Sequence, residues 1–345
     1  MPRHLDMCGV APVSSPGRRL GMGGLSVLPN PCCVPSVERA HRLAESERCS
    51  ARRRRIRRGS TADMIRMDGG PFLMGTETDR GFPADGEGPV RRVHVDPFYL
   101  DVFPVTVESF REFVAATRHV TEAEQFGWSF VFHTQVPRDR YDSVADDTVA
   151  GHEWWCKVSG ADWRHPEGPD SAVSERPDHP VTHISHSDAL AYCDWAGKRL
   201  LTEAEWEFSA RGGLEQQTYP WGGELEPGGR HLCNIWQGVF PRDDTGEDGY
   251  RGPCPVDAFP PNGYGIYSMT GNAWEWCADW FDPGYHVTAT RHNPVGPPNG
   301  TARVMRGGSF LCHASYCNRY RVAARTSNTP DSSTSNLGFR CARDI

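Results

Sequence analysis

The chain has 345 residues, of which 38% are hydrophobic, and it contains 36 Gly, 28 Pro, 11 Trp and 12 Cys. This length suits one large domain or two ordinary ones, and the mixture of aromatic residues with Gly and Pro predicts a loop-rich globular protein. The net charge of −7 is divided unevenly, with +8 on residues 1–62 and −15 on the remainder, which argues against nucleic acid as a partner of the main part.

The sequence contains no run of about 18 apolar residues and so predicts no transmembrane helix. The N-terminus also lacks the apolar stretch of a secretory signal, and we expect a cytoplasmic protein without a membrane partner. Residues 1–62 include the arginine run 52–58, which indicates either a nucleic-acid-binding arm or a disordered or over-long extension. We favour the extension, because no downstream feature supports nucleic-acid binding, and place the domain at 63–345.

The first predicted elements are strands. Residues 64–75 predict two short strands joined by a Gly-Gly turn, and residues 90–100 predict a further strand.

Four helices are predicted next along the chain. Thr106 precedes Val107, Phe110 and Phe113 at helical spacing. Two further segments, 121–124 and 202–205, both have the sequence Thr-Glu-Ala-Glu, which matches the capping box at a helix start. A fourth helix is predicted over 187–196, with Gly197 as its C-terminal stop. Residues 214–300 are predicted to be mostly turn and loop.

The motif with the most chemical content is the Cys-x4-Cys pair of Cys312 and Cys317. Thiolate is the nucleophile and the metal ligand, and positive charge from Arg306, Arg319 and Arg321 would favour that form. The spacing leaves three interpretations open: structural thiols or a disulfide, a redox disulfide, or a site for a soft metal. Zinc is disfavoured, because its structural sites take four ligands and no second such pair follows.

Two oxygen-rich segments are further candidates. Asn234-Ile-Trp-Gln-Gly is followed by Thr245-Gly-Glu-Asp-Gly-Tyr, and such oxygen ligands suit calcium, although the residues alone favour an Asx-type turn. Glu275, between two tryptophans, is either a ligand or a buried, paired carboxylate. Gly-x-Ser-x-Gly, phosphate-loop and His-Glu-x-x-His motifs are absent.

Several longer blocks resemble the formylglycine-generating enzyme, or sulfatase-modifying factor, family over about residues 64–345. They include Gly-Gly-Pro-Phe-Leu-Met-Gly, Ala-Gly-Lys-Arg-Leu-Leu-Thr-Glu-Ala-Glu-Trp-Glu, Gly-Asn-Ala-Trp-Glu-Trp and Asn-Thr-Pro-Asp-Ser-Ser-Thr-Ser-Asn-Leu-Gly-Phe-Arg-Cys. The Cys-x4-Cys block and the last of these are the most specific. The resemblance implies an α+β fold: a single compact domain with little regular secondary structure, related to C-type lectins.

The resemblance also implies an activity. It predicts an oxidase that converts the cysteine of a Cys-x-Pro-x-Arg motif, in an unfolded or extended sulfatase segment, to Cα-formylglycine, using O2, a thiol reductant and copper. The residues that it assigns to metals are the copper ligands Cys312 and Cys317, the calcium ligands Asn234, Ile235, Asp248 and Tyr250, and a second calcium site at Ser268, Gly271, Ala273 and Glu275. It also assigns Ser309 and Tyr316 to the substrate pocket.

Two structural disulfides of the vertebrate members bear on the cysteines. Cys193 and Cys341 match one of them and are a possible disulfide here, whereas Ala210 and Val322 replace the partners of the other.

Two rival functions remain. One is a non-catalytic, lectin-like binding paralogue on the same fold, which loss of the cysteine pair would favour. The other is a sulfur–histidine-betaine oxidase, whose His-x3-His-x-Glu iron motif this sequence lacks.

Overall fold

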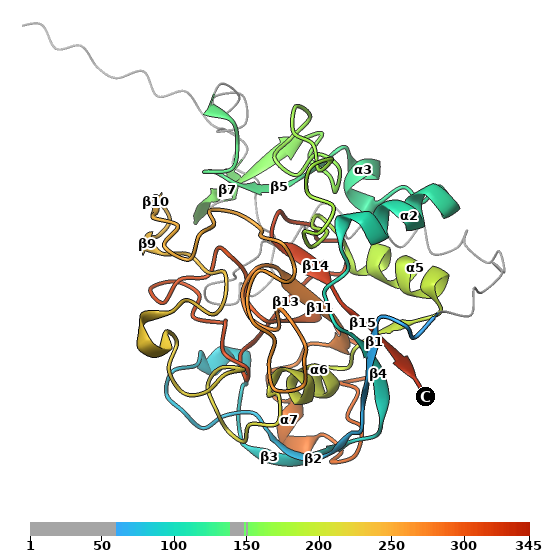
Figure 1. Ribbon diagram of the computed structural model, residues 1–345, viewed down its shortest axis with the longest axis vertical. Helices are drawn as coiled ribbons and strands as arrows, with labels where there is room; N and C mark the ends of the chain where they lie inside the picture. The colour runs from blue at the N-terminus through green and yellow to red at the C-terminus, as the bar shows by residue number, and fades with distance from the viewer. Residues whose placement is uncertain (1–59, 139–147, 150) are drawn as a thin grey trace, which may run out of the picture.

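The computed structural model describes residues 60–138, 148–149 and 151–345 (Figure 1). Most of the expected extension, residues 1–59, lies outside these ranges, so its predicted character stays a prediction. Within the described residues, no helix is both long enough and apolar enough to span a membrane.

Two four-stranded sheets form the middle of the molecule. One has the order β1-β4-β15-β8 and is antiparallel throughout; the other has the order β13-β12-β11-β14, in which β14 runs parallel to β11. Their strands are β1 (Met64–Met67), β4 (Phe98–Asp101), β8 (Arg199–Leu200), β11 (Trp274–Trp280), β12 (Arg303–Arg306), β13 (Arg325–Asn328), β14 (Leu337–Phe339) and β15 (Cys341–Asp344).

Three smaller sheets lie around these two. A three-stranded sheet of order β5-β7-β6 and the β2–β3 pair occupy opposite ends in Figure 1, and the short β9–β10 hairpin projects at the side. Their strands are β2 (Gly70–Met74), β3 (Arg91–Val95), β5 (Trp128–Phe132), β6 (Thr148–Val149), β7 (His152–Ser159), β9 (Gly238–Val239) and β10 (Asp243–Asp244). The two short strands predicted over 64–75 are present as β1 and β2, but they do not pair with each other, because β1 pairs with β4 and β2 with β3.

The helices begin where their caps predict. Thr106, Thr121 and Thr202 each accept a hydrogen bond from the third residue beyond them, and the latter two form complete capping boxes. The helix predicted from 187 starts slightly earlier, since Ser185 is its cap, and it ends at Gly197 as predicted. The helices are α2 (Val107–Thr117), α3 (Glu122–Phe126), α5 (His186–Ala196), α6 (Glu203–Ala210) and α7 (Tyr285–Thr288), with single 3-10 turns at Pro83–Asp85 and Pro227–Gly229.

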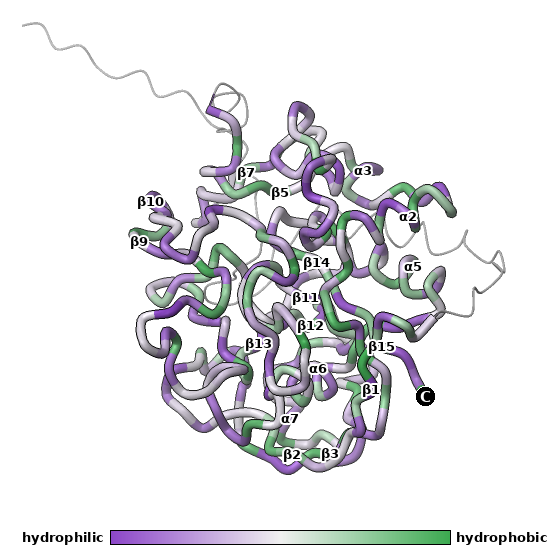
Figure 2. The backbone as a smooth tube through the Cα atoms, viewed as in Figure 1, coloured by the Kyte–Doolittle hydropathy of each residue, from purple (hydrophilic) through white to green (hydrophobic). Residues whose placement is uncertain are grey.

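Aromatic side chains supply much of the core. Trp206, Trp274 and Trp276 are fully buried, and Phe110 packs edge-on against Phe113. Hydropathy alternates over short distances along the chain rather than in long runs (Figure 2). The prediction of a loop-rich domain built on aromatic residues is confirmed.

Candidate active site

The two cysteines lie in the loop that follows β12. The loop leaves the strand through Gly307 and Gly308, both in the left-handed region with φ of 97° and 75°. A side chain at Gly308 would lie 3.1 Å from the backbone of Tyr320, so glycine lets the start of the loop pack against its end.

Two short turns inside this loop bring the sulfur atoms together. The backbone N–H of Cys312 donates to the carbonyl of Ser309 at 2.9 Å, and that of Cys317 donates to the carbonyl of His313 at 2.9 Å. The two Sγ atoms lie 2.6 Å apart, and the exposed fractions of the two residues are 1% and 0%. The structure thus places both predicted copper ligands at one buried point.

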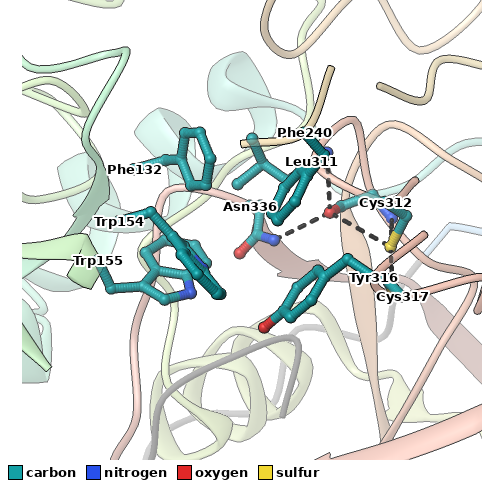
Figure 3. A pocket seen from close by; sticks show the side chains of 10 residues that line it. Phe132, Trp154, Trp155, Phe240, Leu311, Cys312, Tyr316, Cys317 and Asn336 are labelled. Atoms are coloured by element: carbon teal, nitrogen blue, oxygen red, sulfur yellow. Dashed lines mark hydrogen bonds between the residues drawn. The ribbon is translucent and has the colours of Figure 1, made fainter. Parts of the chain in front are cut away.

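An aromatic pocket opens onto this sulfur pair. Figure 3 shows Trp154 and Trp155 facing Cys312 across the pocket, with Tyr316 and Asn336 between them. Its lining consists of Phe132, Trp154, Trp155, Phe240, Ser309, Leu311, Cys312, Tyr316, Cys317 and Asn336. The lining residues come from β5, β7, the β9–β10 hairpin, the cysteine loop and the segment before β14, so the site exists only in the folded chain.

The rings of the pocket wall hold one another in place. The Tyr316 ring stacks on Phe240 with centroids 4.7 Å apart and meets Trp154 edge-on at 5.1 Å. The predicted pocket residues Ser309 and Tyr316 both line the pocket together with the two cysteines.

A chain of hydrogen bonds fixes the direction of the Ser309 hydroxyl. Thr334 donates through Oγ1 to Asn336 Oδ1 at 2.7 Å, which leaves the amide nitrogen of Asn336 to donate to Ser309 Oγ at 2.9 Å. The backbone N–H of Leu311 donates to the same oxygen at 3.3 Å. Because both lone pairs of Ser309 Oγ are engaged, its O–H remains as a donor.

The hydroxyl and the backbone N–H of Ser309 both lie near the sulfur atom of Cys312. Its Oγ lies 4.0 Å from Cys312 Sγ, and its backbone N–H donates to that sulfur at 3.3 Å. Two donor groups of one residue therefore lie close to Cys312 Sγ.

The arginines near the cysteines have a different role from the one predicted. Arg319 pairs with Asp85 (2.6 Å) and Arg321 with Glu87 (2.6 and 2.7 Å). Both pairs are buried and tie the loop to residues 85–87. The hypothesis that these arginines supply net positive charge to the thiols is not supported, because a carboxylate compensates each one.

Arg306 is engaged in the same way. It contacts Glu203 and Glu207 of α6 at 3.1 and 2.6 Å, and Arg325 binds Glu203 through two further contacts of 2.7 Å. Nearby arginines favour the ionised form of Glu203 and hold its pKa below the usual carboxyl range despite burial. This cluster anchors β12, and hence the start of the cysteine loop, to α6.

The pocket wall carries two buried donors without an acceptor. The indole Nε1 atoms of Trp154 and Trp155 have no hydrogen-bond partner among the described residues. Buried polar groups are nearly always paired in folded proteins, so these two indole N–H groups are available to donate to acceptor oxygens of a bound ligand.

The residues of the first predicted calcium site also lie together. Asp248 Oδ2 accepts from the Ile235 N–H at 3.1 Å, and Asp248 Oδ1 accepts from the Tyr250 N–H at 3.0 Å. Gln237 donates through Nε2 to the Ile235 carbonyl and, at 3.0 Å, to Asp248 Oδ2. Two of the proposed ligand oxygens thus converge on one donor, as they would on a cation, whereas the amide nitrogen of Asn234 is directed to Gly252 O at 2.8 Å.

The second predicted calcium site fits less well. Glu275 is buried and accepts from Arg340 at 2.9 Å and from the Trp206 indole at 2.8 Å. The hydroxyl of Ser268 donates to Val256 O at 2.8 Å. Because Arg340 already neutralises Glu275, the paired-carboxylate interpretation of this residue matches the geometry, and calcium at Ser268, Gly271, Ala273 and Glu275 stays a prediction.

The possible disulfide partners face each other. Cys193 of α5 and Cys341 of β15 are both buried, with sulfur atoms 3.6 Å apart. Ala210 and Val322, which replace the second pair, are fully buried in one hydrophobic cluster, so apolar packing occupies that position.

The fold and the site together define a class of protein: a single domain of small sheets and long ordered loops that carries a buried cysteine pair under an aromatic pocket. PvdO from Pseudomonas aeruginosa shares this fold, with a TM-score of 0.60 at 24% identity over 82% of this chain and 94% of that one. Residues 50–345 match the Sulfatase-modifying factor enzyme 1-like domain.

Two relatives are informative. The formylglycine-generating enzyme of Thermomonospora curvata is 60% identical over 284 residues, which cover 81% of this chain and 93% of that one. A bovine protein named inactive C-alpha-formylglycine-generating enzyme 2 is 48% identical over 287 residues, 82% of this chain and 89% of that one. The chain belongs to the formylglycine-generating enzyme family.

Sequence reasoning missed several residues of the site. Asn336 and Thr334 lie in the Asn-Thr-Pro-Asp-Ser-Ser block that carried the family resemblance, but no spacing rule connects them to Ser309. The Trp154-Trp155 pair could have been noted as an aromatic wall, although its place opposite Cys312 depends on sheet packing.

Proposed function

We propose that this protein is a copper-dependent oxidase that converts the cysteine of a Cys-x-Pro-x-Arg motif in sulfatases to Cα-formylglycine, using O2 and a thiol reductant. The observation that carries the proposal is the pair of buried sulfur atoms 2.6 Å apart at the base of the aromatic pocket. Membership of the family supplies the reaction class.

The residues of the pocket fit copper by the chemistry of their donors. Among the described residues that line it, Cys312 and Cys317 supply sulfur, and none of the others carries a carboxylate or an imidazole. Soft thiolates select Cu(I) over hard cations. Cys312 and Cys317 would hold the metal, and bound copper would supply the redox chemistry with O2 that protein side chains lack.

The substrate would enter as an extended peptide. The Trp154 and Trp155 indole N–H groups are buried donors without acceptors in the described part of the chain, and they suit the carbonyl oxygens of a peptide backbone. The aromatic wall of Phe240 and Tyr316 would exclude water from the reacting sulfur. Ser309, oriented by Asn336 and Thr334, would direct its O–H at the sulfur site.

The overall reaction consumes one O2 and one pair of electrons from the thiol reductant. The thiol-bearing methylene of the substrate cysteine reacts with O2, two electrons and two protons to give an aldehyde, one hydrogen sulfide and one water. The C–S bond breaks, a C=O bond forms and the cysteine carbon is oxidised by two electrons. The reductant provides the remaining two electrons that O2 requires.

The alternative is a non-catalytic binding paralogue on the same fold. The name of the bovine relative indicates that the family includes inactive members. The presence of both cysteines in one buried pocket favours catalysis here.

The test is oxidation of a Cys-x-Pro-x-Arg peptide, with a thiol reductant in air, by the copper-loaded protein. We expect the peptide cysteine to lose mass with the unaltered protein but not with Cys317→Ser. Cys233→Ser should still cause the loss of mass, because Cys233 is a buried cysteine outside the pocket. No oxidation by the loaded protein would refute the activity, and equal rates with and without copper would refute the metal dependence.

A further inference from the structure

A histidine–aspartate–histidine cluster lies outside the pocket, where β3 ends. His94 and Asp96 come from one segment, and His292 comes from the loop before β12. One ligand atom from each of the three residues lies within 4.8 Å of the other two. Figure 1 places β3 at the opposite end of the molecule from β5 and β7, which form part of the pocket wall.

The separations suit one small ion. Asp96 Oδ1 lies 3.5 Å from His94 Nε2 and 3.1 Å from His292 Nε2. Ligand atoms bound at about 2.0–2.1 Å to a tetrahedral ion are about 3.3 Å apart, so both distances match a shared centre.

The backbone holds the two histidines in register. The His94 N–H donates to Arg291 O at 2.8 Å, and the Asn293 N–H donates to His94 O at 2.9 Å, so His94 and His292 form a parallel bridge. Two segments far apart in sequence are thereby fixed side by side.

Asn293 orients the carboxylate. Its amide nitrogen donates to Asp96 Oδ2 at 2.7 Å, and its Oδ1 accepts from the Asp96 N–H at 2.8 Å. This double contact turns Oδ1 of Asp96 toward both imidazoles. Metal-binding side chains typically accept or donate such hydrogen bonds to a neighbouring residue, because these bonds orient the ligand atom toward the metal.

We propose that His94, Asp96 and His292 form a second metal site, which takes a divalent transition metal ion such as Zn2+ or Cu2+ and links the end of β3 to the loop before β12. Imidazole and carboxylate donors select such ions, whereas the sulfur pair selects Cu(I). The rings stack at 9° with centroids 4.9 Å apart, so binding rotates them about Cβ–Cγ. Their side-chain exposures of 43% and 63% leave room for that rotation and for a water ligand.

Zn2+ is the probe, because it is redox-inactive. Calorimetric titration of the full chain should include a binding event that His292→Ala removes. Asn293→Ala should weaken the same event by about tenfold, as loss of an outer partner does. Titration with Co2+ should give a nitrogen–oxygen spectrum for this event, without the thiolate charge-transfer band that binding at the sulfur pair would produce.

His165→Ala is the matched control. His165 is a half-exposed histidine that pairs with Asp162 at 3.2 Å but belongs to no three-ligand cluster among the described residues, and its loss should leave the titration unchanged. Peptide oxidation by His292→Ala should equal that of the unaltered protein, which shows that the variant folds. If His292→Ala keeps the binding event, or if the event has a thiolate spectrum, the site is refuted, whereas the proposed oxidase function is unaffected.

Discussion

Replacement of Ser309 by alanine tests the hydrogen-bond chain beside the cysteines. The variant loses the side-chain donor that the chain Thr334–Asn336–Ser309 directs at Cys312. A hydrogen bond to a charged group contributes about 1.5–3 kcal/mol. Since about 1.4 kcal/mol corresponds to a tenfold change in rate, we expect kcat/KM for the Cys-x-Pro-x-Arg peptide to fall by about 10- to 100-fold.

The same change has a predictable effect on stability. The Leu311 N–H would lose the acceptor Ser309 Oγ, and Leu311 is buried. A buried donor without an acceptor costs about 1–3 kcal/mol, so the melting temperature should fall by several degrees without loss of the fold.

Thr334→Val tests the orientation of the Asn336 amide while the Ser309 hydroxyl is still present. Valine keeps the shape of threonine but cannot donate to Asn336 Oδ1, so the amide is no longer held in one orientation. We expect a loss in kcat/KM that is smaller than that of Ser309→Ala. Peptide kinetics and melting curves should be measured on the same samples. A folded Ser309→Ala protein with kcat/KM within about twofold of the unaltered value would refute the donor role, because even the weaker limit for such a bond corresponds to about tenfold.

Three further predictions concern the metals and a buried carboxyl. Cys312→Ser and Cys317→Ser should each abolish turnover with little change in melting temperature, and near-normal rates after copper loading would contradict the ligand assignment. Calcium chelation should lower the melting temperature of the unaltered protein but not of Asp248→Asn, because the mutation removes the charged ligand; an unaffected unaltered protein would argue against the calcium site. Burial raises the pKa of Asp279 to about 8. Between its usual pKa of about 3.9 and pH 8, this carboxyl is protonated in the folded chain and ionised in the unfolded chain. The free energy of unfolding therefore falls as the pH rises toward 8. Asp279→Asn should flatten that fall in urea titrations at several pH values, and an unchanged slope would contradict the assignment.

Local chemistry made several parts of the fold predictable. Capping boxes at Thr121 and Thr202 and the glycine at 197 act over three or four residues, so their helices could be placed from sequence. Strand pairing could not, because β1 and β2 are neighbours in sequence but pair with β4 and β3 in different sheets.

The sequence by itself determined the family and the helix starts, and it predicted the cysteine pair as the reactive element, since each depends on residues close together in the chain. Only the tertiary structure decided the surroundings of that pair. It matched Arg319 and Arg321 with carboxylates at positions 85 and 87, far away in the chain, and it aligned Asn336 with Ser309. Charge compensation and hydrogen-bond direction depend on three-dimensional distance, and in this loop-rich fold that distance is set by long-range packing rather than by local spacing.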